Sequence, residues 1–292
     1  MEVRDFGFTG LKVSALGLGT GRIGGNELTE KEIEYLLNYA VDNGVNLIDT
    51  ARSYGEAEIR IGKYLSHRRK DFILSTKVGY DVEGCEDWTY DCVIQGINKA
   101  LRLLKTDYLD IVHLHSCNKD ILEKGEVIEA LTRAVQEGKV KVPAYSGDND
   151  ALNYAVHSGR FGSIQTSINL YDQRAINDIL WNSKQNYMGV IAKRPAANFV
   201  WQFKERPSDN YIVTYYDRMH EMNLELGMPI EEASLRFSCF TYGVDSIIVG
   251  TKNLEHLKNN IQSVAKGKLH EDLYKMIRDR FKEKDNNWSS LV

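Results

Sequence analysis

The chain has 292 residues, 42% hydrophobic and 27% charged, and its 37 basic and 41 acidic side chains give a net charge of −4 with histidine neutral. This composition is typical of a soluble globular protein with a large core, and it excludes a disordered chain. The charges are spread along the sequence, so no basic patch indicates nucleic acid as a partner. Charges interrupt segment 1–13 and no apolar run reaches about 20 residues, so we expect a cytoplasmic protein that does not enter a membrane. The four cysteines lack paired CxxC spacing, which predicts reduced thiols.

The predicted elements alternate between short apolar strands and longer amphipathic helices. A hairpin comes first, formed by segments 3–8 and 11–16, which meet at Thr9 and Gly10. Eight strands are then predicted at 16–20, 46–51, 72–78, 108–115, 140–147, 163–169, 189–195 and 246–251. Helices are predicted at 29–43, 90–105, 127–137, 151–157 and 253–261, with two more inside 210–240 and one at 271–284.

This alternation predicts the fold class. Strands separated by helices form parallel β/α units, and eight such units close into a (β/α)8 TIM barrel, here with an N-terminal β-hairpin and extra C-terminal helices. No linker rich in proline, glycine or serine interrupts the series, so we expect a single domain over residues 1–292. Segment 196–208, which is rich in aromatic and polar residues, is predicted to be a long loop.

Ionisable side chains stand where three consecutive strands end. Asp49 ends the second strand with Tyr54 in the loop beyond it, and Lys77 and His115 end the third and fourth. The active sites of such barrels lie at these strand ends. Neighbouring strands are about 4.8 Å apart, so Asp49 and Lys77 can pair, and an ammonium group about 4 Å from a phenol stabilises its phenolate form. Tyr54 then becomes a usable general acid, with His115 polarising a bound carbonyl. A purely structural salt bridge is the other interpretation of Asp49 and Lys77.

Three segments resemble the aldo-keto reductase family, and the resemblance extends over essentially the whole chain. They are GVNLIDTARSYG (44–55), LSTKVG (74–79) and LDIVHLH (109–115). The resemblance implies an enzyme that reduces an aldehyde or ketone to an alcohol with a nicotinamide cofactor. It also implies that Tyr54 is the acid, that Lys77 activates it, that Asp49 holds Lys77 and that His115 orients the carbonyl.

The same resemblance implies the cofactor site. YSGDN (145–149) is similar to the segment that binds the nicotinamide carboxamide, and GTKNLEHLKNN (250–260) to the one that grips the adenosine phosphate, where a helix start favours an anion. The implied cofactor residues are Gly19, Thr20, Asp49, Ser146, Gly147, Gln165, Lys193, Arg194, Gly250, Thr251, His256 and Asn260. NADP(H) is the expected cofactor, with NAD(H) as the alternative. Trp88, Phe199 and Trp201 are expected to form the substrate pocket around a small-molecule carbonyl compound.

Four of these positions depart from the commonest family pattern. Lys193 stands where many members have an aromatic ring, and Gly147 where asparagine is frequent. Gly250 replaces a phosphate-pairing lysine of some members, and His256 an arginine. These departures leave the preference for NADP(H) dependent on other groups in the loop, such as Lys252.

Two other classes of protein share features with this sequence. His113 and His115 share one face of a strand, as in the zinc sites of metal-dependent amidohydrolases, but the other five histidines fall in helical or surface segments, so no metal is expected. A non-catalytic nicotinamide-binding sensor would be indicated by loss of Tyr54 or His115, and both are present. We expect a monomer or a weak homo-oligomer.

Overall fold

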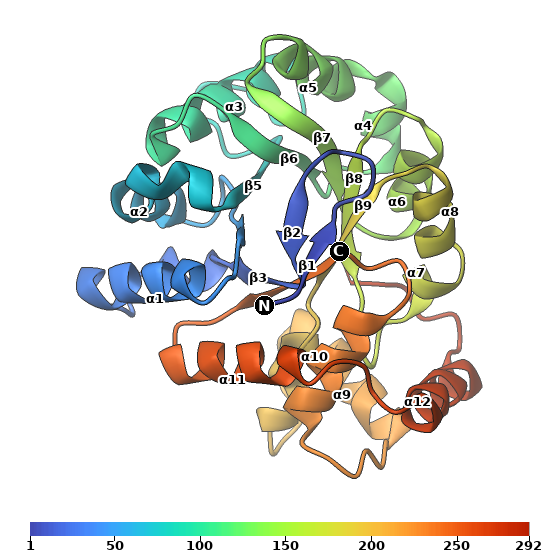
Figure 1. Ribbon diagram of the computed structural model, residues 1–292. Coiled ribbons are helices and arrows are strands. Elements are labelled where there is room, and N and C mark those ends of the chain that lie inside the picture. The colour runs from blue at the N-terminus through green and yellow to red at the C-terminus, as the bar shows by residue number, and fades with distance from the viewer. Residues whose placement is uncertain (292) are drawn as a thin grey trace.

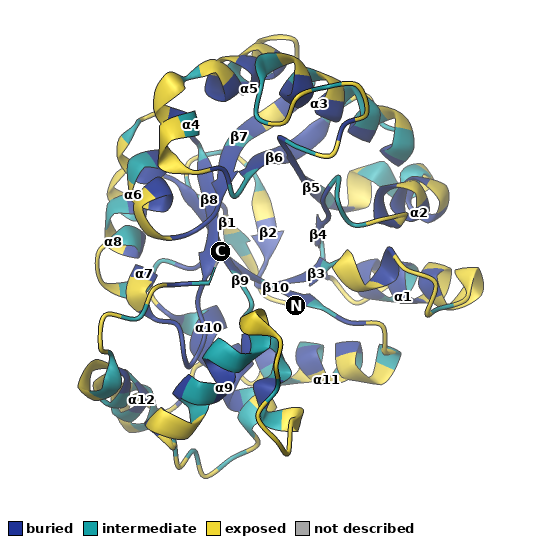
Figure 2. Ribbon diagram, turned by 180° about the vertical axis from the view of Figure 1, so that it is seen from behind, coloured by how far each residue is buried: buried dark blue, intermediate teal, exposed yellow. Residues whose placement is uncertain are grey.

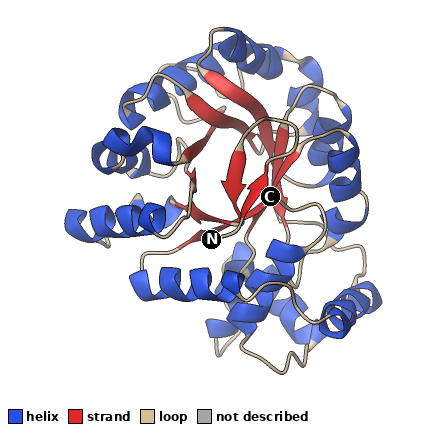
Figure 3. Cartoon of the chain, viewed as in Figure 1, coloured by secondary structure: helices blue, strands red, loops and turns tan. Residues whose placement is uncertain are grey.

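The computed structural model, which describes residues 1–291, is a closed barrel of eight parallel strands inside a ring of helices (Figure 1 and Figure 3). Around the barrel the strands follow the order β10 (Ser246–Gly250), β3 (Leu16–Gly19), β4 (Leu47–Asp49), β5 (Ile73–Val78), β6 (Leu109–His115), β7 (Val140–Ser146), β8 (Ser163–Ser167) and β9 (Gly189–Lys193). The predicted (β/α)8 class is confirmed. Each strand is buried in the centre, while the exposed residues gather on the outer faces of the helices (Figure 2).

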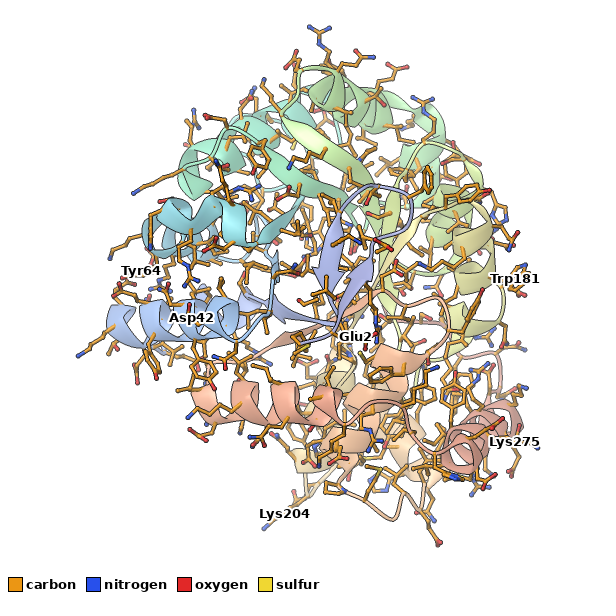
Figure 4. The ribbon with its side chains drawn as sticks, viewed as in Figure 1. Glu2, Asp42, Tyr64, Trp181, Lys204 and Lys275 are labelled. Atoms are coloured by element: carbon orange, nitrogen blue, oxygen red, sulfur yellow. The ribbon has the colours of Figure 1, made fainter. Side chains whose placement is uncertain are left out.

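The helices lie on the outside of the barrel, and all but the last two connect successive strands. They are α1 (Glu30–Asp42), α2 (Ala57–Tyr64), α3 (Tyr90–Leu104), α4 (Lys119–Lys124), α5 (Glu126–Gln136), α6 (Asn149–His157), α7 (Arg174–Asn177), α8 (Ile179–Gln185), α9 (Asn210–Met222), α10 (Ile230–Phe240), α11 (Leu254–Ala265) and α12 (Glu271–Lys284). Short 3₁₀ helices lie at η1 (Gly21–Ile23), η2 (Ser66–Asp71) and η3 (Ala197–Gln202), and an N-terminal hairpin pairs β1 (Val3–Asp5) with β2 (Lys12–Ser14). Exposed side chains such as Trp181, Lys204 and Lys275 project from this outer layer (Figure 4). None of the helices over residues 1–291 is long and apolar enough to cross a membrane.

The hairpin covers one end of the barrel (Figure 1). Phe6 and Val13, both fully buried, pack on Leu47 and Ile111 from the barrel strands. A Cβ atom on Gly189 would lie 2.6 Å from the Phe6 ring, so only glycine fits at the start of β9. Figure 1 shows the hairpin lying across the centre of the barrel.

Capping and amphipathic patterning explain why α1 forms where the sequence predicts it. The Thr29 hydroxyl accepts a hydrogen bond from the Glu32 backbone N–H at 3.3 Å, and the Glu32 carboxylate accepts one from the Thr29 N–H at 2.8 Å. Such a cap stabilises a helix by about 1 kcal/mol. Ile33 and Leu37 then bury the inner face of the helix against the barrel.

The structure adds short helices that the apolar pattern does not predict, namely α2, α4, α7 and α8. In α2 the inward positions include charged residues: Glu58 is paired with Arg52 and bonded to Thr76, and Arg60 is paired with Glu30. These charged residues, Glu58 and Arg60, are buried themselves and replace the apolar residues that periodicity detects. Within the segment predicted as a loop, η3 adds an irregular 3₁₀ turn.

Candidate active site

The C-terminal ends of the strands surround a cavity of about 760 Å³. The predicted site residues that line it are Gly19, Asp49, Tyr54, Lys77, Trp88, His115, Ser146, Gln165, Lys193, Arg194, Phe199 and Gly250. The barrel brings them together because parallel strands present their carboxyl ends at one edge. In the barrel register, Asp49 lies beside Ser75 and Lys77 beside His113.

A buried ion pair forms the base of this cavity. The Lys77 ammonium donates to Asp49 Oδ2 at 2.5 Å and to the Thr50 carbonyl at 2.8 Å. The other carboxylate oxygen, Asp49 Oδ1, accepts from Ser75 at 2.9 Å and from the Gln165 amide at 3.0 Å. Burial alone would lower the pKa of Lys77, but the charge of Asp49 and then the nearby Tyr54 raise it above its ordinary value. Lys77 is therefore a permanent cation held in one position.

Tyr54 lies directly against this cation. The Lys77 Nζ atom is 5.1 Å from the centre of the Tyr54 ring, and that ring meets His115 edge-on with centroids 6.2 Å apart. A close approach of the backbone holds the tyrosine loop, because a Cβ on Gly24 would lie 1.8 Å from the Tyr54 carbonyl oxygen. Glycine at position 24 therefore lets the loop after β4 turn back over the cavity.

His115 is neutral and connected to a second tyrosine. Burial, followed by the positive charges of Lys77 and Lys193, lowers the pKa of His115 to about 2. Its Nδ1 atom is 3.0 Å from the Tyr80 hydroxyl, which is in turn 3.2 Å from the Ser53 hydroxyl. The imidazole that lines the cavity is thus uncharged, and the Tyr80 hydroxyl holds it at Nδ1.

Polar side chains of β7 and β8 extend the network from the ion pair. The Ser146 hydroxyl donates to Gln165 Oε1 at 3.0 Å, and the amide nitrogen of Gln165 donates to Asp49. All three side chains are buried, so the orientation of the Gln165 amide is fixed by its partners at both ends.

Lys193 ends β9 with its ammonium bound to a carboxylate. Its Nζ atom is 2.9 Å from Asp148 Oδ2, and Asp148 also accepts from the Thr166 hydroxyl at 2.6 Å and the Ser167 N–H at 2.9 Å. Burial lowers the pKa of Lys193, which Asp148 partly opposes, and the neighbouring Arg194 lowers it further. The lysine is therefore held by its charge at a position where the family often has a ring.

Comparisons with known proteins show the family. A model of the aldo/keto reductase family matches residues 15–280. The chain belongs to this family. It is 29% identical over 310 residues to the uncharacterized oxidoreductase YqkF of Bacillus subtilis (strain 168), across 97% of each chain. It is 27% identical over 294 residues to L-galactose dehydrogenase of Arabidopsis thaliana, across 91% of this chain and 88% of the relative.

A solved structure gives the same result. The holo form of aldo-keto reductase AKR11C1 from Bacillus halodurans matches with a TM-score of 0.84 and 26% identity, covering 96% of both chains. The protein is accordingly an oxidoreductase of the aldo/keto reductase family, whose members generally use a nicotinamide cofactor.

The residues present in this aldo-keto reductase fit such a cofactor. A second cavity of about 390 Å³, lined by His256 and Asn260 at the start of α11, shares Ala196 and Phe199 with the first. The two cavities therefore adjoin at Ala196 and Phe199. Arg22, Lys193 and Arg194 line the first cavity and supply positive charge for a pyrophosphate. Gly19 and Gly250 are paired neighbours on β3 and β10, and both line the first cavity.

Four predicted residues do not line either cavity. The Thr20 hydroxyl donates to the Asp49 carbonyl at 3.0 Å, and the Thr251 hydroxyl donates to the Asn253 carbonyl at 3.2 Å. Trp201 packs on Phe199 with ring centroids 5.7 Å apart. These three side chains shape the walls from behind.

Gly147 is the fourth, and its surroundings explain why it departs from the family pattern. A Cβ atom there would lie 2.3 Å from the Tyr145 hydroxyl, which itself donates to the Cys117 carbonyl at 2.8 Å. The frequent asparagine therefore has no room in this chain.

The two histidines of β6 have different partners. His113 Nε2 is 3.2 Å from the Ser75 hydroxyl, deep in the barrel, while His115 contacts Tyr80 at the cavity. Across residues 1–291, no three His, Cys, Asp or Glu side chains are grouped to hold a metal ion.

Sequence reasoning missed other residues at the cavity, chiefly Tyr80, Arg22 and Tyr211. Tyr80 follows Lys77 by three positions, so a search for polar residues just beyond the strand ends would have found it. Tyr211 lies on α9, far along the chain, and only the folded barrel brings it to the site.

Proposed function

We propose that this protein reduces an aldehyde or ketone to an alcohol with NAD(P)H, using Tyr54 as the general acid. One observation carries the proposal: the buried Lys77 and Asp49 pair holds a permanent cation 5.1 Å from the centre of the Tyr54 ring. A bound nicotinamide supplies the hydride in this chemistry. The protein side chains supply the proton and stabilise the charge that develops on oxygen.

The proton path follows from the charges. As a carbonyl oxygen becomes negative, Tyr54 donates its phenolic proton to it, and the resulting phenolate faces the Lys77 ammonium. Asp49 holds that ammonium with a contact of 2.5 Å, so little reorganisation is needed when the phenolate forms. A buried cation without Asp49 would be costly, which explains the need for the pair.

His115 contributes a hydrogen bond rather than a charge. With its pKa near 2, the ring stays neutral over the range in which enzymes work. A neutral imidazole has one N–H donor, which can orient a carbonyl oxygen without competing with Tyr54 to supply the proton.

We further propose NADPH as the preferred cofactor, with NADH as the alternative. His256 and Lys266 line the second cavity, where their side chains favour the binding of the extra phosphate of NADPH. Glu231 and Glu232 line the same cavity and oppose it. Lys266 is itself 2.6 Å from Glu232, so the preference should be modest. Initial rates and dissociation constants with both cofactors measure it, and a clear preference for NADH would contradict this proposal.

The substrate is proposed to be a small carbonyl compound bound beside Trp88 and Phe199, which line the first cavity. One relative is named L-galactose dehydrogenase, so aldoses belong in the substrate panel beside simple aldehydes and ketones. We also propose a monomer or weak homo-oligomer that works in the cytoplasm. Sedimentation measures the first property and cell fractionation the second.

Replacement of Tyr54 by phenylalanine tests the proposed acid. Tyr54→Phe keeps the ring but removes the proton, so turnover should fall by about 10²- to 10⁴-fold while the cofactor dissociation constant stays unchanged. The matched control is Tyr35→Phe on α1, where the ring is 57% exposed and turnover should not change. Near-normal turnover in Tyr54→Phe would refute the assignment. Cofactor binding without turnover of any carbonyl by the unaltered protein would instead indicate a non-catalytic sensor.

A further inference from the structure

Tyr80 lines the first cavity beside His115 and contacts the Nδ1 atom of its ring. It lies in the loop between β5 and α3, and its hydroxyl is 3.0 Å from His115 Nδ1 and 3.2 Å from Ser53 Oγ. The Tyr80 ring also stacks on the His115 ring, with centroids 5.3 Å apart and planes 24° from parallel. The connections after β4 and β5 and the last residue of β6 therefore meet at one hydroxyl group.

The position of Tyr80 is built into the loop. Its other neighbour is Trp88, with ring centroids 5.4 Å apart. The preceding residue, Gly79, has φ of +131°, and a Cβ there would lie 2.2 Å from the Trp88 ring. Only glycine allows the indole to pack there, and the tyrosine is thereby clamped between Trp88 and His115.

The protonation states limit the hydrogen-bond pattern. His115 is neutral because burial and nearby cations lower its pKa to about 2, and burial raises the pKa of Tyr80, so its phenol keeps its proton. A neutral imidazole has one donor nitrogen and one acceptor nitrogen. If Nδ1 accepts a hydrogen bond from the Tyr80 hydroxyl, the ring hydrogen must be on Nε2.

The side chains of Tyr80, His115 and Ser53 favour one direction for the hydrogen bond between Tyr80 and His115. Imidazole nitrogen is the strongest base among them and phenol the strongest acid, so the matched bond runs from the Tyr80 O–H to His115 Nδ1. Ser53 can then donate to the Tyr80 oxygen, which leaves every member satisfied. Within residues 1–291, His115 Nε2 has no hydrogen-bond partner in the protein, and the ring lines the cavity. Its N–H is thus available to a ligand.

We propose that Tyr80 is a positioning residue, which holds His115 in the tautomer that carries its hydrogen on Nε2 and so directs that N–H at the substrate oxygen. The inference rests on the proposed function for its consequence in turnover, but not for the tautomer itself. Without the Tyr80 hydroxyl, His115 can exchange between tautomers, and one of them presents a lone pair to the carbonyl oxygen. The molecules in that tautomer cannot orient the carbonyl, so kcat falls in proportion to their share, about twofold for an even mixture.

Nuclear magnetic resonance of protein labelled with ¹⁵N-histidine tests the tautomer directly. The chain has seven histidines, and a His115→Asn variant identifies the signal of interest. In the unaltered protein we expect a protonated Nε2 and an unprotonated Nδ1, and in Tyr80→Phe a mixture of tautomers. Tyr35→Phe is the control and should match the unaltered protein. A hydrogen on Nδ1, or identical spectra for Tyr80→Phe and the unaltered protein, would overturn the inference.

Kinetics and binding separate positioning from a structural role. Tyr80→Phe keeps the stacked ring, so the melting temperature and the dissociation constant for NADPH should stay the same, while kcat falls by the fraction of His115 that the spectra show without a hydrogen on Nε2, about twofold for an even mixture. Unchanged kcat together with the altered tautomer would show that the N–H of His115 is not used on the substrate. That result would overturn the positioning role while leaving the proposed function to the Tyr54→Phe test. If the unaltered protein reduces no carbonyl, the proposed function fails, and the spectra alone decide the tautomer.

Discussion

Acid should destabilise this protein through two histidines of β6. His113 is fully buried, and burial followed by the charge of Lys77 lowers its pKa well below the ordinary value. The same causes lower the pKa of His115 to about 2. In the unfolded chain both return to an ordinary pKa near 6.5. As the pH falls through 6.5, the unfolded state takes up protons that the folded state does not, so the free energy of unfolding decreases.

The size of the effect follows from this linkage. Between pH 7.5 and pH 5.5 an unfolded histidine gains nearly one proton, which stabilises the unfolded state by about 1.4 kcal/mol. For His113 and His115 together the loss of folding stability is about 2.7 kcal/mol. Above pH 7.5 neither histidine contributes, because both are then neutral in either state.

Urea unfolding at the two pH values, followed by tryptophan fluorescence, measures this loss. His115→Asn should reduce the difference in unfolding free energy between the two pH values by about 1.4 kcal/mol. His113→Asn should give a similar reduction if it folds, and carboxylates that titrate in the same range cancel in the comparison. His270→Asn is the control, because that side chain is 79% exposed and solvated in both states. A His115→Asn variant with the pH dependence of the unaltered protein would show that His115 takes up a proton in the folded state, which would refute the neutral imidazole.

Two further predictions concern the ion pair and the residue that follows β7. Lys77→Met leaves the Asp49 carboxylate buried without its cation, so we expect a loss of about 3–5 kcal/mol in unfolding free energy and of most turnover. Adding Asp49→Asn should recover stability in urea unfolding but not turnover, and no stability loss in the single variant would contradict the buried-pair argument. Gly147→Asn should lower stability by about 1–3 kcal/mol, because its Cβ overlaps Tyr145. The loss, measured by urea unfolding, should shrink in a Tyr145→Leu background, and an equal loss in both backgrounds would place the strain elsewhere.

The barrel and the side chains proposed to be catalytic were predictable from local sequence patterns. Strand and helix alternation needs only residues near one another in the chain, and parallel strands necessarily present their ends at one edge. Asp49, Lys77 and His115 end three consecutive strands, so their meeting in one cavity required no knowledge of packing. The short helix α2 escaped because Glu58 and Arg60 occupy its inward positions, and their burial depends on partners elsewhere in the chain.

The sequence by itself therefore determined the fold, the family and the set of groups that can transfer a proton. Only the tertiary structure decided how neighbouring groups restrict one another. Tyr145 excludes a side chain at position 147, Asp148 binds the ammonium of Lys193, and Tyr80 reaches Nδ1 of His115. The physical reason is range: periodicity and strand ends are local properties of the chain, whereas steric exclusion, ion pairing and tautomer choice depend on distances of a few ångströms between distant segments.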